Sequence, residues 1–336
     1  MPQPLAQQVV VITGAGSGIG RETARQFAHR GASVVLAARS GGALDSLVDE
    51  VERLGGRGLA VPTDVADYGQ VEALAERAVE AFGRIDTWVN NAGISTYGTV
   101  EQMTPEELRR VIEVNLLGEI YGMKAALPHL KATGHGVLIN VSSALGKRGV
   151  ALQAAYCAAK HGVVGFAEAL RLELRHEGSD VAVVDVLPSS INTPLFGHAR
   201  SKLGVLPMPI PPIYEPRVVA DTIVAAAERP VRSVFAGGTG KLLEIGQRIS
   251  PALVDRYLLG PGKIVDNQQT DRPDDAVDNM DTPIDDVGAT TGEFGKNSRS
   301  RSLYTELLGL HPNRARALIG AALAAGVGVL LRAGRS

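Results

Sequence analysis

Apolar runs and helix-like segments alternate along the chain from residue 9 to about residue 240. The runs are short, rich in β-branched residues and nearly free of polar positions, which is typical of strands buried on both faces. They lie at 9–13, 33–38, 58–64, 86–93, 136–143, 181–188 and 233–238. Several segments between them have helical periodicity and end at glycine, which favours the position after a helix. The alternation predicts an α/β fold, a doubly wound parallel sheet covered by helices on both faces.

The pattern changes after residue 240, and we divide the chain there. A doubly wound unit is expected over 7–240, followed by a short helical extension over 241–265. Residues 266–302 contain many Asp, Asn, Thr, Ser and Gly and almost no large apolar side chains. Such a segment buries too little surface to offset its ordering, so we expect disorder or a loosely draped loop. A helical and apolar tail over 303–336 closes the chain.

The apolar stretch of this tail, 317–331, is 15 residues long and is flanked by arginines. A helix that spans a bilayer needs about 20 apolar residues, with about 17 as a lower bound. We therefore favour a soluble or peripheral, cytoplasmic protein. Membrane contact through the C-terminal tail is the alternative.

Composition narrows the class of partner. The formal net charge of -2 argues against nucleic-acid binding, which usually needs a basic face. A single cysteine, Cys157, fits a reducing compartment, and the N-terminal residues lack the pattern of a secretory signal. The seven histidines form no metal-binding motif, so we expect no metal.

A glycine-rich loop follows the first strand, where TGAGSGIG places Gly14, Gly18 and Gly20 directly before a helical segment. Glycines let the backbone approach a pyrophosphate, and the helix N-terminus offers unpaired N–H groups. A dinucleotide site requires this strand–loop–helix context. We therefore expect a phosphate-binding loop.

The end of the second strand indicates which dinucleotide is bound. An acidic residue about 20 positions after the loop would bind the ribose hydroxyls of NAD. The chain has no acid there and reads VVLAARS, with Arg39 after Ala38. Arginine can bind a 2′-phosphate bidentately, so we favour NADP(H) over NAD(H). The alternative is that Arg39 is only a solvated charge.

Residues 155–162 read AYCAAKHG, which puts Tyr156 and Lys160 on one face of a predicted helix. Alone, they could be an inconsequential surface pair. Together with TGAGSGIG, NNAG at 90–93 and a serine after the fifth strand, they resemble the short-chain dehydrogenase/reductase family over roughly residues 7–240. The resemblance implies a Rossmann-type doubly wound sheet and an NAD(P)-dependent oxidoreductase acting on CH–OH groups; this chain adds a C-terminal extension. We also expect a homo-oligomer.

The resemblance assigns residues by position. The family's catalytic positions are matched by Asn115, Ser143, Tyr156 and Lys160, and Ser143 is chosen over Ser142 because it lies thirteen residues before Tyr156. The cofactor-binding positions are matched by Gly14, Ser17, Gly18, Ile19, Gly20, Arg39, Asp64, Val65, Asn91, Ala92, Gly93, Tyr156, Lys160, Pro188, Ile191 and Thr193.

The resemblance also implies roles. Tyr156 exchanges the proton of the substrate oxygen while hydride moves between nicotinamide C4 and the substrate carbon. A free phenol has a pKa of about 10, and we expect the Lys160 ammonium, together with the positive ring of the oxidised cofactor, to lower it. Ser143 stabilises the substrate oxygen, and Lys160 also holds the nicotinamide ribose. Asn115 holds a water that links Lys160 to solvent.

One position departs from the family's pattern, since Ser189 follows Pro188 where glycine is usual. We expect a restricted turn and an altered substrate edge, with no catalytic group lost. The next segment, which in the family covers the substrate, is apolar and predicts a hydrophobic alcohol or carbonyl substrate. Packing against the protein body or another subunit is the alternative role for its apolar side chains, which are Leu195, Phe196, Leu203, Leu206, Met208, Ile210 and Ile213.

Three functions remain open at this point. The first is an NADP(H)-dependent alcohol dehydrogenase or carbonyl reductase. The second is an epimerase or dehydratase that shares the Tyr–Lys arrangement. The third is a nucleotide-binding protein without turnover, which the presence of Ser143, Tyr156 and Lys160 disfavours.

Overall fold

The computed structural model describes residues 2–260, 266–284 and 288–311, so the predicted apolar stretch at 317–331 lies outside the described residues. Its centre is a seven-stranded sheet in the order β12-β7-β6-β4-β1-β2-β3, in which all neighbouring strands are parallel. The strands are β1 (Val9–Thr13), β2 (Ser33–Ala38), β3 (Arg57–Pro62), β4 (Thr87–Asn90), β6 (Val137–Val141), β7 (Ala182–Pro188) and β12 (Ser233–Ala236). The predicted doubly wound α/β fold is confirmed.

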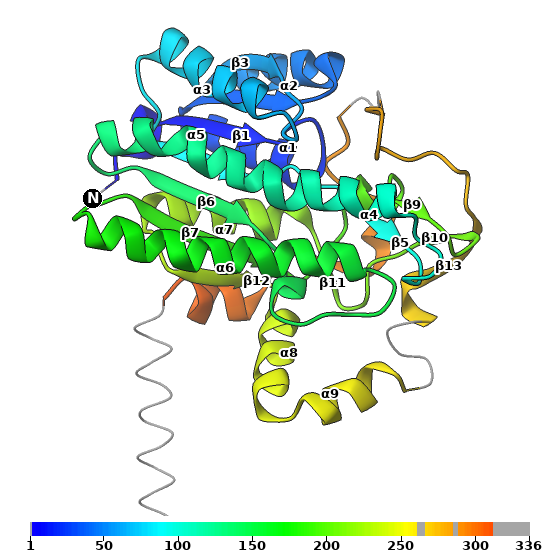
Figure 1. Cartoon of the computed structure of the whole chain (residues 1–336). Helices are drawn as coiled ribbons and strands as arrows, with labels where there is room; N and C mark the ends of the chain where they lie inside the picture. The colour runs from blue at the N-terminus through cyan, green and yellow to red at the C-terminus, as the bar shows by residue number, and fades with distance from the viewer. Residues whose placement is uncertain (1, 261–265, 285–287, 312–336) are drawn as a thin grey trace, which may run out of the picture.

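Helices cover both faces of this sheet (Figure 1). Alternate residues of each strand face opposite sides, so Val10 and Ile12 join one apolar core while Val9 and Val11 join the other. The first core includes residues of α1 (Gly18–Ala28), α2 (Gly41–Arg53) and α7 (Pro216–Glu228). The second includes residues of α3 (Tyr68–Phe82), α4 (Pro105–Ile112), α5 (Gly118–Ala132) and α6 (Ala154–His176). Burial on both sides explains why the strands are continuously apolar.

Shorter elements surround the carboxyl end of the sheet. Small strand pairings are formed by β5 (Thr96–Tyr97) with β9 (Arg200–Ser201), by β10 (Val205–Pro207) with β13 (Gln269–Pro273), and by β11 (Ile213–Tyr214) with β8 (Ser190–Ile191) and β14 (Ser298–Arg299). The 3₁₀ turns are Leu5–Gln7, Ala144–Gly146, Pro194–Phe196, Asp266–Gln268 and Gly295–Asn297. Two π-helical turns lie at Glu113–Leu117 and Thr305–Gly309.

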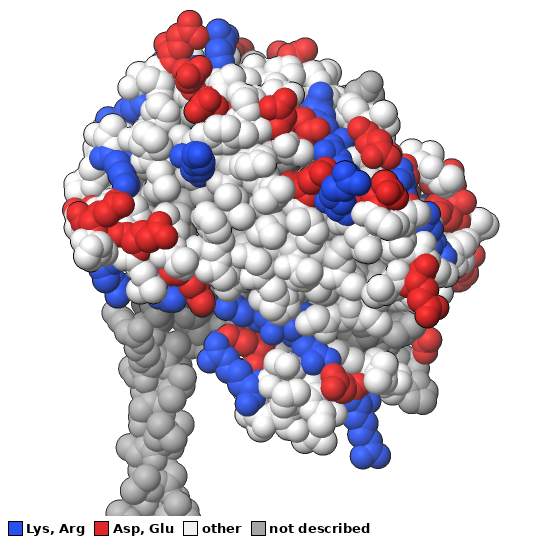
Figure 2. Space-filling model, viewed as in Figure 1, with Lys and Arg blue, Asp and Glu red and all other residues white. Residues whose placement is uncertain are grey.

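The expected helical extension consists of α8 (Gly238–Ile249) and α9 (Pro251–Leu258), which project from one end of the molecule (Figure 1). Several of its large apolar side chains are exposed, namely Leu242, Ile245, Ile249, Leu253 and Tyr257. On the face shown in Figure 2, acidic and basic side chains are interspersed. Within the described ranges, no helix combines the length and the apolar character needed to cross a bilayer.

Residues 274–284 and 288–294, which we call the strap, run along the molecule beside α4 (Figure 1). Met280 is buried in the second apolar core, and the Arg110 side chain of α4 donates to its carbonyl oxygen at 3.2 Å. An ion pair of 2.8 Å joins Asp278 to Arg200. The strap is therefore anchored by backbone carbonyls, ion pairs and apolar contacts of Met280 and Phe294, where composition predicts disorder or a loosely draped loop.

Candidate active site

One cavity of about 380 Å³ follows the carboxyl ends of the strands. The order of strands reverses between β1 and β4, and ligands of doubly wound sheets bind at such a switch point. Arg39 and Asp64, the glycine loop, Tyr156 and Lys160 all line this cavity. The strand order places the glycine loop, after β1, between Arg39 and Asp64, after β2 and β3, and the end of β6, where Lys160 lies. All residues that the sequence predicts for catalysis or cofactor binding line this cavity except Gly20 and Asn115.

The glycine loop is packed against the loop after β4. Gly14 has a φ of 65°, and a Cβ atom at this position would lie 2.7 Å from Cα of Ala92. A Cβ at Gly20 would lie 2.2 Å from the carbonyl oxygen of Gly14, so Gly20 is required inside the turn and not at the cavity wall. The Asn91 amide then ties the two loops together by donating to the carbonyl oxygens of Thr13 and Gly14, at 3.0 and 3.2 Å.

The start of α1 faces the cavity through Ser17, Gly18 and Ile19. The first N–H groups of a helix have no partner within it and attract anions. One of them, the N–H of Gly18, donates to the carbonyl oxygen of Ala289 in the strap at 2.9 Å. A glycine cradle beside a helix N-terminus fits a dinucleotide pyrophosphate, with the strap adjacent to it.

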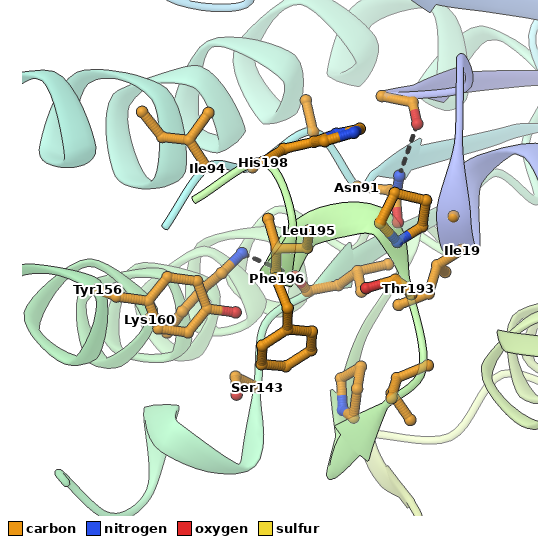
Figure 3. A pocket seen from close by; sticks show the side chains of 18 of the residues that line it. Ile19, Asn91, Ile94, Ser143, Tyr156, Lys160, Thr193, Leu195, Phe196 and His198 are labelled. Carbon is orange, nitrogen blue, oxygen red and sulfur yellow. Dashed lines mark hydrogen bonds between the residues drawn. The ribbon is translucent and has the colours of Figure 1, made fainter. Parts of the chain in front are cut away.

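The predicted catalytic pair extends from α6 into the cavity (Figure 3). The Lys160 Nζ atom lies 5.8 Å from the centroid of the Tyr156 ring. Ser143 follows β6 and also lines the cavity, and its Oγ accepts a hydrogen bond from the N–H of Leu145 at 3.0 Å. The helix spacing read from the sequence and the end of a central strand thus bring a phenol, an amine and a hydroxyl to one place.

Burial raises the pKa of the Tyr156 phenol, and this effect outweighs the opposing effects of the Lys160 ammonium and of a hydrogen bond with Ser143. Lys160 therefore acts in the predicted direction but does not lower the phenol's pKa below its ordinary value. The reason is desolvation, because a buried phenolate loses its hydration. The expected lowering then depends on the other contribution, the positive ring of the oxidised cofactor.

Lys160 has a buried partner that sequence reasoning missed. Its Nζ donates to Oε1 of Glu119 at 2.6 Å and to the carbonyl oxygen of Val141 at 2.9 Å. Although burial alone would lower the pKa of Lys160, Glu119 and Tyr156 raise it above its ordinary value. Burial raises the pKa of Glu119 to about 7. A signal existed in the sequence, because Glu119 follows Asn115 by four positions and so shares its helical face.

Asn115 lies in the π-helical turn between α4 and α5 and is fully buried. Its side chain accepts a hydrogen bond from the N–H of Ile94 at 2.8 Å and donates to the carbonyl oxygen of Ile94 at 2.7 Å. Both polar groups of the amide are thus engaged by the loop after β4. The side chain fixes that loop, and the π-helical turn, a departure often found at functional sites, interrupts the regular backbone ladder there.

At the far end of the cavity, Arg39 is bound to the strap. Its guanidinium donates to the carbonyl oxygens of Met280 and Asp281, each at 3.4 Å, and to that of Asn279. Burial lowers the pKa of Arg39, and Asp64 only partly opposes this. Burial alone would raise the pKa of Asp64, but a backbone hydrogen bond and the 2.9 Å ion pair with Arg110 bring it below its ordinary value. Arg39 therefore lies where the sequence predicts, with partners that the sequence does not reveal.

The substrate end of the cavity is apolar. Four of the seven apolar residues predicted to cover the substrate line it, namely Leu195, Phe196, Met208 and Ile210. Leu206 and Ile213 are instead buried away from it, as in the alternative of packing against the body. The helical extension contributes Leu243 and Tyr257, and the loop after β4 contributes Ile94 and Tyr97. These two residues of the extension lie beyond the doubly wound unit predicted over 7–240, and the sequence did not reveal their place in the cavity.

Ser189 links the substrate edge to α8. Its Oγ donates to the carbonyl oxygen of Gly237 at 3.0 Å and accepts from the N–H of Gly240 at 3.1 Å. Among the described residues, positive φ values outside glycine occur only at Leu152 and Ala276. The turn at Ser189 therefore avoids the left-handed region, and its hydroxyl connects β7 to the start of α8.

The chain matches the short chain dehydrogenase family model over residues 8–204. The protein belongs to the short-chain dehydrogenase/reductase family. It is 39% identical over 329 residues to the uncharacterized oxidoreductase YxnA of Bacillus subtilis, a match that covers 96% of this chain and 89% of YxnA. It is 36% identical to the cyclohexanol dehydrogenase of an Acinetobacter species, over 66% of this chain and 88% of that enzyme.

Solved structures of the family show the same fold. A short-chain dehydrogenase/reductase of Burkholderia phymatum in complex with NAD aligns with a TM-score of 0.68 and 27% identity, over 76% of this chain and 98% of that chain. An alcohol dehydrogenase of Thermococcus sibiricus complexed with 5-hydroxy-NADP aligns with a TM-score of 0.60 and 28% identity, over 68% and 95% of the two chains. The protein is thus an NAD(P)-dependent oxidoreductase of the CH–OH class.

Proposed function

We propose that the protein is an NADP(H)-dependent dehydrogenase or reductase that interconverts a hydrophobic alcohol and the corresponding ketone or aldehyde. One observation carries the proposal. Tyr156, Lys160 and Ser143 line the same cavity as the glycine loop and Arg39, and the strand order places the glycine loop between them. A substrate at the catalytic end thus lies within reach of a nicotinamide ring attached to a dinucleotide that follows the strand ends.

Side chains of the protein bind the substrate oxygen and exchange its proton. When bound, the nicotinamide cofactor supplies or accepts the hydride at the substrate carbon. In the reducing direction the Tyr156 hydroxyl donates its proton to the carbonyl oxygen, so that C=O becomes H–C–O–H, with the hydride on carbon and the proton on oxygen. Ser143 donates a hydrogen bond to the same oxygen and stabilises the charge that develops on it. Lys160 holds the nicotinamide ribose and stabilises the Tyr156 phenolate.

Return of the proton to Tyr156 needs a path to solvent. We assign this path to Lys160 and to a water held at Asn115. Because the Asn115 side chain is engaged by Ile94, the backbone of the π-helical turn is the group that this water would contact. The side chain then acts by holding the turn in place.

The preference for NADP(H) rests on charge. The end of β2 carries Arg39 and no acid, and the nearby carboxylate of Asp64 is already neutralised by Arg110. A 2′-phosphate would therefore meet the Arg39 guanidinium and a neutralised Asp64 carboxylate at this position. Related structures hold either NAD or NADP, so the preference follows from these residues alone.

The substrate class rests on the apolar lining, and the named relative acts on cyclohexanol by its name. The decisive experiment follows the absorbance of reduced nicotinamide while a panel of alcohols and ketones is offered with NADP(H) and NAD(H). We expect turnover on apolar cyclic or long-chain substrates, faster with NADP(H). Turnover on polar sugars alone, or none with either cofactor, would contradict the proposal. The predictions of a homo-oligomer and of a cytoplasmic location remain predictions.

A further inference from the structure

We propose that Glu119 is a positioning residue that keeps the Lys160 ammonium charged and directed toward Tyr156. The inference rests on the proposed function for its catalytic meaning. The contact itself belongs to the fold, so it can be measured without any substrate.

The geometry is that of a buried ion pair. Lys160 Nζ and Glu119 Oε1 lie 2.6 Å apart, and the two side chains are only 3% and 2% exposed. Within the described residues, the acceptors bonded to Lys160 Nζ are this carboxylate and the neutral carbonyl of Val141. An ammonium buried without a counter-ion loses its hydration and tends to release its proton. Glu119 is thus the group that makes a charged lysine compatible with this position.

Only one of the two oxygens of the Glu119 carboxylate is hydrogen-bonded within the described residues. Within the described residues, Oε2 of Glu119 has no hydrogen-bond partner, and neither has Nδ2 of Asn140. By contrast, the Glu119 backbone is fixed, because Asn90 donates to its carbonyl oxygen at 3.1 Å. One carboxylate oxygen therefore faces Lys160 while the other can carry a proton.

Other charged groups near the pair are few. Tyr156 on α6 acts on Lys160, and Asp185 on β7 acts on Glu119. Asp185 is itself paired with Arg171 at 2.8 Å. Its remaining effect raises the pKa of Glu119 and so opposes the ion pair with Lys160. Glu119 is the largest of the contributions that raise the pKa of Lys160, and Tyr156 adds to it.

The proposal gives distinct charge states with pH. Below about pH 7 Glu119 carries a proton in the wild type, so a Glu119→Gln variant imitates it. Above that pH the wild type has an ion pair, whereas the variant leaves the ammonium alone in a buried site. Desolvated lysines can lose several units of pKa. The variant should therefore lose the Lys160 charge in the alkaline range in which the wild type retains it.

The first test needs no activity. Titration of ¹³C-labelled lysine Cε resonances by NMR reports each ammonium, and the Lys160 signal is the one that disappears in Lys160→Ala. We expect its midpoint to fall by at least about two pH units in Glu119→Gln, as for other desolvated lysines. Glu119→Asp keeps the charge on a shorter side chain, so its Lys160 midpoint should lie between those of the wild type and of Glu119→Gln. An unchanged Lys160 midpoint in both variants would overturn the proposal.

The second test is the pH profile of kcat/KM for alcohol oxidation. Glu119→Gln should resemble the wild type near pH 6 and fall at least tenfold below it by pH 9.5, and Glu119→Asp should recover part of that loss. The matched control is Asp86→Asn, a buried carboxylate paired with Arg84 at the opposite end of β4. Asp86→Asn should leave the shape of the kcat/KM–pH profile unchanged.

A pH-independent loss in Glu119→Gln would mean a purely structural role and would overturn the proposal. If no substrate is turned over at all, the NMR titration still decides the Glu119 contact, and only the proposed function fails. If Glu119→Gln does not fold, Glu119→Asp carries both measurements.

Discussion

Two cations mark the two ends of the cavity, and they are held in different ways. Lys160 is bound by Glu119 and Val141, which belong to the central sheet and its covering helices. Arg39 is bound by carbonyl oxygens of the strap, about 240 positions later in the chain. The catalytic cation thus depends on the core of the fold. The cation that we assign to cofactor preference depends on a segment with little apolar surface of its own.

This difference teaches which part of the site is rigid. A buried ion pair between core elements moves only if the core does, whereas carbonyl acceptors on a peripheral segment can exchange for a phosphate. We therefore expect substitutions at the catalytic end to change rates by orders of magnitude. Substitutions at the Arg39 end should change cofactor affinity and preference more than rate.

The largest effect should come from Tyr156→Phe, which removes the proton donor at the catalytic end. General acid–base catalysis contributes about 10²- to 10⁴-fold, so kcat should fall by at least that range and leave little detectable turnover. The dissociation constant for NADPH, measured by fluorescence titration, should stay within a few-fold of the wild type. Substantial residual turnover would refute the assigned role.

Lys160→Ala should damage turnover, cofactor affinity and stability together, because Glu119 is left buried without its partner. Breaking a buried pair from one side costs about 3–5 kcal/mol. In this variant burial raises the folded-state pKa of Glu119 without the opposing effect of Lys160, so stability is present at low pH and is lost as pH rises. Denaturant unfolding should show a larger deficit at pH 8.5 than at pH 5.5.

The matched control for this variant is the double substitution Lys160→Ala/Glu119→Gln. It removes both charges and should recover much of the stability, since replacing a whole buried pair is often nearly neutral. It should not recover turnover. Equal deficits in the single and double variants, at both pH values, would show that the ion pair is not the cause.

Arg39→Asp tests the other cation. Loss of a charged hydrogen bond to a 2′-phosphate costs about 1.5–3 kcal/mol, which is at least about tenfold in affinity. We expect weaker NADPH binding, improved NADH binding and nearly unchanged kcat with saturating cofactor. A wild type that prefers NADH, or a variant whose preference is unaltered, would refute the NADP(H) assignment.

Met280→Ala tests whether the strap belongs to the site. Met280 is 2% exposed, and Met→Ala substitutions in cores cost about 2–5 kcal/mol. Because Asn279, Pro283 and Ile284 line the cavity, loosening this anchor should raise the dissociation constant for NADPH by about tenfold. Faster hydrogen exchange should be confined to the strap, residues 274–284 and 288–294. Val277→Ala, at an exposed strap position, is the control and should change neither measurement.

The smallest effect is expected at Ser189→Gly, which restores the residue usual in the family. Two hydrogen bonds to the start of α8 are lost, at about 1 kcal/mol each in stability. KM for bulky substrates should change, because Leu243 and Tyr257 of the extension line the cavity, while KM for NADPH should not. A change in KM for NADPH without a change in KM for bulky substrates would mean that the turn at Ser189 shapes the cofactor site instead.

The sequence by itself determined the doubly wound sheet, the glycine loop and the catalytic face of α6. These features depend on local periodicity and short spacings, such as the four positions between Tyr156 and Lys160, and such patterns persist whatever surrounds them. Parallel strands then place their carboxyl ends at one edge, so residues after β1, β4 and β6 meet without further information.

Only the tertiary structure decided the partners of Lys160 and Arg39 and the direction in which the pKa of Tyr156 shifts. Glu119 meets Lys160 across α5 and α6, and the strap meets Arg39 after a long excursion of the chain. Composition predicts a loose segment there because it counts apolar residues, whereas the strap is held by carbonyls and ion pairs. Desolvation likewise depends on the depth of burial, and no spacing of residues reveals how much water the fold removes from a phenol.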